Sequence, residues 1–114
     1  MKNEVTEWSV RASGGANAVS TATKAASTQL GVNHYVTWVF VSSNGQPAAA
    51  VVALVRENAS TTRYEFQIPA AAFSNVHVNF AFPLRITENT SVDITCPALG
   101  AGVTSSVVIG GYSR

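Results

Sequence analysis

Residues 34–41 read HYVTWVFV, and this stretch decides the fold. It consists almost entirely of β-branched and aromatic residues, whose side chains fit a pleated strand and lose rotamer freedom in a helix. Since successive side chains of a strand point to opposite faces, the pattern predicts one face made of Val36, Trp38 and Phe40. The opposite face then carries Tyr35, Val39 and Val41. Both faces are mostly apolar, which is typical of a central strand of a sandwich.

Residues 75–82 and 63–68 alternate between apolar and polar side chains, which predicts strands with one buried and one wet face. In the first strand, the side chains expected to be buried are Val76, Val78, Phe80 and Phe82. In the second, they are Tyr64, Phe66 and Ile68. Weaker alternation predicts five more strands, at residues 4–12, 19–25, 49–57, 91–96 and 103–112.

Turn-forming residues separate these strands. The strongest turn signal is Asn44-Gly45, which lies between two apolar runs and is typical of a β-hairpin. Pro83 is expected to end the strand that precedes it. Pro69 suits the start of one helical turn at residues 70–73.

About eight strands at a spacing of roughly 8–12 residues predict an all-β fold, a single-domain antiparallel β-sandwich. We expect residues 1–18 to form an N-terminal arm and edge strand, and residues 19–114 to form the sandwich domain. Such a sandwich has exposed edge strands, and packing against other subunits is one way to cover them.

Charge is scarce in this chain of 114 residues. Charged side chains make up 11% of it, against roughly 25% in an average soluble domain, and the net charge is +1. This favours an assembled protein that keeps part of its surface against other subunits, and the alternative is a monomer covered by Ser, Thr and Asn. No apolar run approaches the length of about 18 residues that a membrane span needs, and residues 1–10 lack the apolar centre of a signal peptide. We therefore expect synthesis in a cytoplasm.

The titratable side chains form no recognisable catalytic or metal-binding pattern. His34 and His77 lie far apart, without His-x-His or Glu-x-x-His spacing, so each is expected on a partly wet strand face. Cys96, the single cysteine, excludes an internal disulfide and is expected to be a small buried hydrophobe rather than a nucleophile. Asp93 is the only aspartate and is expected on an outer face. The acids available for a glycosidase-type pair are Glu57, Glu65, Glu88 and Asp93, and their spacing selects no pair.

The glycine-rich runs do not match a phosphate-binding loop. Residues 13–16 and 110–111 lack the following helix and lysine that such a loop needs. The sequence therefore predicts no catalytic, cofactor-binding or metal-binding residue, and we expect no enzyme.

The basic residues stand singly along the chain, and they are Lys2, Arg11, Lys24, Arg56, Arg63, Arg85 and Arg114. With a net charge of +1 they make a poor footprint for nucleic acid, so no nucleic-acid partner is expected. Most aromatic residues lie in strand patterns and are expected in the core: Tyr35, Trp38, Tyr64, Phe66, Phe80, Phe82 and Tyr112. Trp8 has charged neighbours, and it is either a core residue of an edge strand or an interface anchor.

The order of these segments resembles that of small virion proteins of tailed bacteriophages. The resemblance covers residues 19–112 and rests on an Ala/Thr/Ser-rich N-terminal region followed by five segments, residues 34–43, 48–58, 63–68, 82–94 and 107–112. The family's Asp-Gly turn after the Ala/Val strand is replaced here by Arg56-Glu57-Asn58.

The resemblance implies a jelly-roll-like β-sandwich that is assembled in the host cytoplasm and located in the virion. Its expected function is that of a capsid decoration (auxiliary or cement) protein, which binds capsomer junctions and stabilises the phage head. The expected partners are the major capsid protein and copies of the chain itself as a homotrimer, with no cofactor, nucleic acid or membrane. An N-terminal arm at residues 1–11 could reach a neighbour by adding a strand to an exposed edge.

Two other functions stay open. The first is a tail, fibre or baseplate-associated module that binds a receptor or a carbohydrate. Exposed aromatic residues in loops would favour it, and the expected loops at 13–18, 43–47 and 97–102 contain none. The second is a small β-fold enzyme, which needs His34 or His77 beside a carboxylate.

Overall fold

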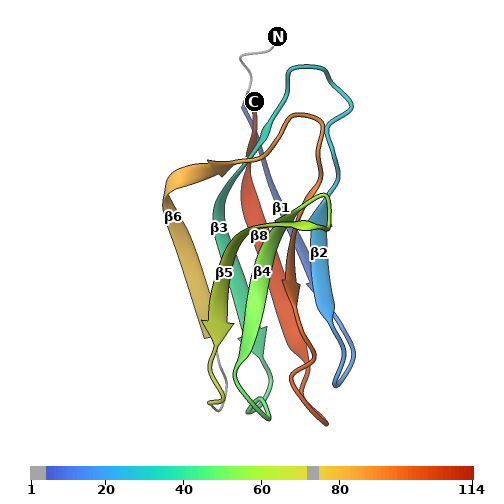
Figure 1. Ribbon diagram of the computed structural model, residues 1–114, viewed down its shortest axis with the longest axis vertical. Helices are drawn as coiled ribbons and strands as arrows, with labels where there is room; N and C mark the ends of the chain where they lie inside the picture. Colours follow the sequence, from blue (N-terminus) through green and yellow to red (C-terminus); the bar gives the residue numbers. More distant parts are fainter. Residues whose placement is uncertain (1–4, 72–74) are drawn as a thin grey trace.

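Eight β-strands build two four-stranded antiparallel sheets in the computed structural model, which describes residues 5–71 and 75–114 (Figure 1). The sheet that we name the β3 sheet has the order β1-β8-β3-β6, from β1 (Thr6–Ser13), β8 (Ser105–Ser113), β3 (His34–Ser43) and β6 (Asn75–Arg85). The other, the β4 sheet, has the order β2-β7-β4-β5, from β2 (Ser20–Lys24), β7 (Val92–Cys96), β4 (Val51–Glu57) and β5 (Thr61–Ile68).

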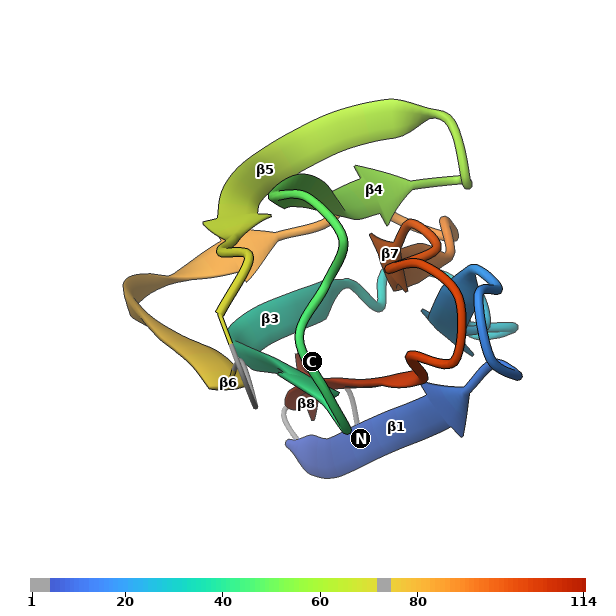
Figure 2. The same cartoon turned by 90° about the horizontal axis from the view of Figure 1, so that it is seen from below.

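Strand pairing follows the chain as though one long hairpin had been rolled up. β1 pairs with β8, β2 with β7, β3 with β6 and β4 with β5, and every pair is antiparallel. This pairing is the strand order of a jelly roll, and Figure 2 shows the two layers end on. The predicted all-β antiparallel sandwich of eight strands is confirmed.

The core between the two sheets is aliphatic. Its fully buried members from β3 and β8 are Val36, Val39, Val41, Val107 and Ile109, and those from the β4 sheet include Ala53, Val55, Ile94 and Cys96. Of the described aromatic residues, none is fully buried. Phe66 and Phe80 are partly buried and pack against the core, as expected. The expectation is wrong for the other aromatic residues: Tyr64 and Phe82 are exposed, and the core cluster does not include Tyr35, Trp38 and Tyr112.

A β-bulge in β3 changes which of its side chains face the core. The register against both neighbouring strands shifts between Val36 and Trp38. The extra residue, Thr37, places Trp38 and Phe40 on the outer face, whereas Val39 follows Val36 into the core. The predicted grouping of Val36 with Trp38 and Phe40 is wrong, because strict alternation fails at a bulge.

β6 continues through Pro83 instead of ending there, and it bends along its length (Figure 1). Its pairing with β3 is interrupted at residues 80–83, opposite the β3 bulge. Proline is tolerated at this point because β6 is an edge strand and the bulge needs no ladder hydrogen bond. The bulge also places Phe82 in solvent with 87% of its surface exposed, so the prediction that Phe82 is buried is wrong.

The remaining expectations concern the chain ends and the turns. β1 pairs with β8 of its own chain, so residues 6–11 of the expected arm lie in the sheet. Residues 1–4, and the last residues of the helical turn expected at 70–73, lie outside the described residues. Asn44-Gly45 connects β3 to β4, which belong to different sheets, so it does not close a hairpin between paired strands.

Candidate functional site

His34, at the start of β3, lies between two hydrogen-bonding partners. Its Nδ1 is 2.7 Å from Ser113 Oγ, and its Nε2 is 2.7 Å from the carbonyl oxygen of Ala25. A carbonyl oxygen only accepts, so Nε2 carries the proton and the Ser113 hydroxyl donates to Nδ1. Burial lowers the pKa of His34, the hydrogen bond to Ala25 opposes this, and the nearby charge of Lys24 lowers the pKa further. His34 is therefore neutral at pH 7.

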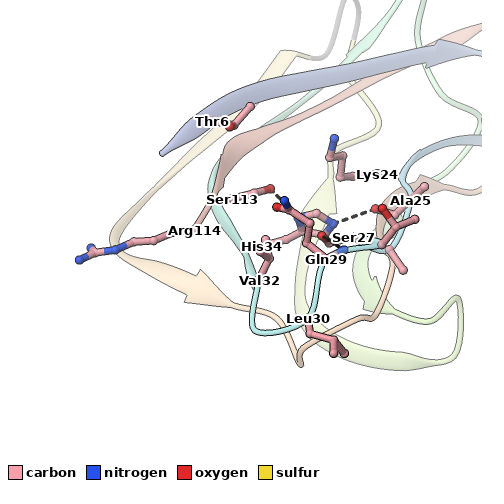
Figure 3. Close-up of a pocket in the computed structure, with 12 residues that line it drawn as sticks. Thr6, Lys24, Ala25, Ser27, Gln29, Leu30, Val32, His34, Ser113 and Arg114 are labelled. Carbon is pink, nitrogen blue, oxygen red and sulfur yellow. Dashed lines mark hydrogen bonds between the residues drawn. The ribbon is translucent and has the colours of Figure 1, made fainter. Parts of the chain in front are cut away.

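An open pocket of about 850 Å³ lies beside His34 (Figure 3). The loop at residues 25–32 forms most of its wall, and Ser113 closes it from β8. No Asp or Glu is among the described residues that line this pocket, so these residues do not supply the carboxylate that the enzyme hypothesis needs beside His34. Backbone hydrogen bonds of 3.0 Å in both directions join Asn33 and Arg114 next to it. The histidine thus ties the loop to the end of β8.

The buried acids are held by ion pairs. Asp93 lies on the outer face of β7, where Arg56 covers it with hydrogen bonds of 3.0 and 3.1 Å to its two carboxylate oxygens. Glu57 accepts hydrogen bonds from Arg63 and from the backbone N–H and hydroxyl of Thr87. Burial alone would raise the pKa of Glu57, but the hydrogen bonds from Thr87 and the charge of Arg63 lower it overall. Both acids join strands or loops and are not paired with each other.

The other reactive side chains are inert or isolated. Cys96 is buried in the core, which confirms its prediction, and burial raises the pKa of its thiol against a hydrogen bond with Ser105. Glu65 and Glu88 are exposed. Within residues 5–71 and 75–114, no three His, Cys, Asp or Glu side chains gather in a way that could hold a metal ion.

β5 and β6 form one open side of the sandwich (Figure 2), and these two strands carry four aromatic residues. We name them the aromatic edge: Tyr64, Phe66, Phe80 and Phe82. The ring of Tyr64 meets Phe80 edge-on, with 5.0 Å between centroids, and lies 6.1 Å from Phe66. Tyr64 is 39% exposed, Phe66 and Phe80 are half-buried, and Phe82 is the most exposed of the four. The aromatic rings at this edge therefore run from partly buried ones that pack against the core to exposed ones.

A second feature is a groove of about 490 Å³ on the outside of the β3 sheet, where β8 carries Gly110 and Gly111. We name it the outer groove, and its side-chain lining comes chiefly from Glu7, Ser9, Thr37, Trp38 and Tyr112. Tyr112 stacks on Tyr35 with 4.9 Å between ring centroids, and His77 meets Trp38 edge-on at 6.0 Å. His77 therefore belongs to an aromatic surface rather than to a site with a carboxylate.

Trp8 is half-buried and packs against the core from the edge strand β1. Its ring meets His34 edge-on at 5.7 Å, and Lys24 Nζ lies 5.6 Å from its centroid. No described residue accepts a hydrogen bond from its buried indole N–H. Of the two predictions for Trp8, the structure supports the core residue of an edge strand.

No family model matches the chain, and no curated protein matches it at a significant level. No helix in the described part of the chain is long and apolar enough to cross a membrane. The function must therefore be argued from two surfaces, the aromatic edge and the outer groove.

Sequence reasoning missed both surfaces because it placed their aromatic residues in the core. Two local signals could have indicated them. A glycine pair inside a strand, such as Gly110-Gly111, marks a close backbone approach. A proline within an alternating strand, such as Pro83, marks an edge strand or a bulge, where a neighbouring side chain such as Phe82 can leave the core.

Proposed function

We propose that the chain is a structural virion protein that decorates a phage capsid, binds capsomer junctions and stabilises the head. The single observation that carries this proposal is the aromatic edge. An exposed phenylalanine on an edge strand is an apolar group that the chain alone does not bury. Aromatic residues are enriched in protein interfaces, so a neighbouring subunit is the kind of partner that this edge suits.

The shape of β6 supports contact through side chains rather than through an added strand. A straight edge strand offers a row of free N–H and C=O groups to another strand. In β6 the regular pairing with β3 stops at residues 80–83, and Pro83 has no N–H to offer to an added strand. Phe82 stands at this interruption and is available to enter an apolar hollow on a neighbour.

A trimer fits this arrangement. In a ring of three, the edge of each protomer meets a different surface on the next protomer, so the exposed Phe82 of every chain is buried by one neighbour. Burying a phenylalanine side chain contributes about 1.5–3 kcal/mol. Each such contact therefore changes the dissociation constant by about tenfold or more.

Sedimentation velocity with and without expanded capsids, assembled from the major capsid protein of the same genome, tests the proposal. We expect the wild-type chain to form trimers and to sediment with the capsids, and Phe82→Ser to weaken both. Leu30→Ser is the matched control, because Leu30 is 79% exposed but lies in the loop beside His34. A wild-type chain that stays monomeric and does not bind capsids overturns the proposal, as does an equal effect of the two substitutions.

A tail, fibre or baseplate-associated binding module is the second candidate function. The outer groove is the observation that favours it, because aromatic and polar side chains line one hollow on a sheet face.

A further inference from the structure

β8 carries two glycines, Gly110 and Gly111, beside the outer groove. A Cβ atom on Gly110 would lie 2.3 Å from Cε2 of Trp38, so the indole rests directly on the glycine backbone. A Cβ atom on Gly111 would lie 1.9 Å from the carbonyl oxygen of Tyr35, where the β3 bulge brings the two strands together. Both distances are far below any contact that a real Cβ makes, so a side chain at Gly110 would displace Trp38 and one at Gly111 would push β8 away from β3.

One side of the groove is built from aromatic rings that are already fixed. Trp38 is held by the backbone of Gly110 and by the edge of His77 at 6.0 Å. Tyr112 is held by the parallel ring of Tyr35 at 4.9 Å, with 15° between the ring planes. Fixed rings with few torsions lose little conformational entropy when a ligand stacks on them.

The other side of the groove carries hydrogen-bonding groups from β1. Glu7 and Ser9 are two residues apart on the strand, so their side chains share its outer face, and both are exposed. No residue in the described part of the chain forms an ion pair or a hydrogen bond with the carboxylate of Glu7. Thr37 adds a hydroxyl from the bulge in β3, where it donates a long hydrogen bond of 3.4 Å to Gly110. The groove thus places a carboxylate and hydroxyls beside two aromatic rings, because Glu7 pairs with Tyr112 across the strands and Thr37 precedes Trp38.

We propose that the outer groove binds a neutral saccharide. A pyranose ring presents a face of C–H groups, which suits the negative face of an aromatic ring, and hydroxyl groups at its rim. Those hydroxyls are donors, and the carboxylate of Glu7 accepts hydrogen bonds only. The volume of about 490 Å³ lies in the lower part of the usual range for small-molecule sites and holds about one or two sugar rings.

The competing ligand for an aromatic groove is a proline-rich peptide in the extended polyproline conformation. Proline has no N–H, so in such a peptide only the residues between the prolines could donate to Glu7, whereas every free hydroxyl of a sugar can. An acidic saccharide would place its negative charge near Glu7 and be repelled. The chemistry of the groove therefore favours the neutral sugar, and it holds for either candidate function, because the outer groove and the aromatic edge share no residue.

A glycan array with neutral and acidic oligosaccharides, followed by calorimetric titration of the best neutral ligand, tests the inference on the full chain. We expect binding of neutral glycans, a loss of at least tenfold in affinity for Glu7→Gln, and loss of detectable binding for Trp38→Ala. Glu65→Gln is the matched control, because Glu65 is an exposed acid on β5, away from the groove, and its affinity should equal that of wild type.

Trp38→Ala removes a ring that packs on β8, so Glu7→Gln keeps the test valid if the alanine variant does not fold. The absence of any neutral ligand overturns the inference, and so does an affinity that neither Glu7→Gln nor a folded Trp38→Ala changes. A preference for acidic glycans, or displacement of the sugar by a proline-rich peptide that binds more tightly, also overturns it. Because Phe82→Ser leaves the groove intact, that variant should keep its sugar affinity whatever its assembly state.

Discussion

The sandwich has two open sides, and the chain closes them with different chemistry. At the β1–β2 side, the hydroxyl of Ser20 in the β4 sheet lies 2.7 Å from the hydroxyl of Ser105 in the β3 sheet. The same Ser20 oxygen accepts a hydrogen bond of 2.8 Å from the N–H of Gly14. At the β5–β6 side, Tyr64 and Phe80 close the gap with an edge-on ring contact across the two sheets.

The difference lies in what each closure leaves outside. The hydrogen bonds of Ser20 pair a donor with an acceptor inside the chain, so this contact needs no further partner. The stabilisation from an aromatic ring grows with the apolar area that is buried. At the β5–β6 side the rings are only partly buried, and Phe82 on the same strand as Phe80 is 87% exposed. One side of the sandwich is closed by hydrogen bonds and the other exposes an apolar ring, so contact with a neighbouring subunit is expected at the β5–β6 side. Three substitutions or conditions test this contrast.

The largest effect is expected for Phe80→Ala. The change removes the ring that meets Tyr64 and packs against the core, so the free energy of unfolding should fall by about 3 kcal/mol. Urea denaturation followed by circular dichroism measures it. Phe82→Ser, two residues away on the same strand, is the control and should change this free energy by less than about 0.5 kcal/mol, because Phe82 is almost fully exposed. Equal losses for the two variants would mean that the edge is not closed by Phe80.

Ser20→Ala should have the next largest effect. It leaves the N–H of Gly14 without its acceptor and removes one of the two partners of the Ser105 hydroxyl, which keeps its hydrogen bond with Cys96, at a cost of about 2 kcal/mol in the free energy of unfolding. The same denaturation experiment measures this loss, with Ser9→Ala as the exposed control. A loss below about 0.5 kcal/mol would show that water replaces the lost contacts and that this side is not sealed.

The strands could be predicted from sequence, because alternation and turn residues are local properties. The faces of β3 could not, because the bulge at Thr37 depends on the approach of Gly110 and Gly111 from a strand some seventy positions away. Because of the extra residue at the bulge, Trp38 faces outward instead of into the predicted core, and its ring lines the outer groove. Periodicity assigns every large apolar side chain to the inside, so it misses aromatics on an outer face.

The contacts between distant strands that form the two sites also could not be predicted from local sequence patterns. His34 meets Ser113 because the jelly roll lays the last strand beside the third, and nothing near His34 in the sequence indicates this. The aromatic edge required knowledge that β5 and β6 lie at the margins of opposite sheets.

The smallest effect is expected on the pH dependence of stability. It tests the β1–β2 side through His34, which packs edge-on against Trp8 of β1. Burial holds the pKa of His34 below its ordinary value of 6.5 in the folded chain. Above pH 6.5 the histidine is neutral in both states, and its contribution to stability is complete. As the pH falls below 6.5, the unfolded chain takes up a proton that the folded chain does not, so the free energy of unfolding decreases until the folded pKa is reached.

For a single group this slope is at most about 1.4 kcal/mol per pH unit, and it begins near pH 6.5, so the free energy of unfolding should be lower at pH 5.5 than at pH 7.5 by no more than about 1.4 kcal/mol. His34→Asn should remove the dependence in this window, whereas His77→Asn, on the outer face of β6, should keep it. Glu57, whose pKa is lowered below 4.5, loses its own contribution only in more acidic solution, so the two effects separate along the pH axis. A slope between pH 7.5 and 5.5 that persists in His34→Asn would assign the titration to another group. The contribution of the β1–β2 side to the free energy of unfolding would then not change in mild acid, and only its hydrogen bonds would distinguish this side from the aromatic edge.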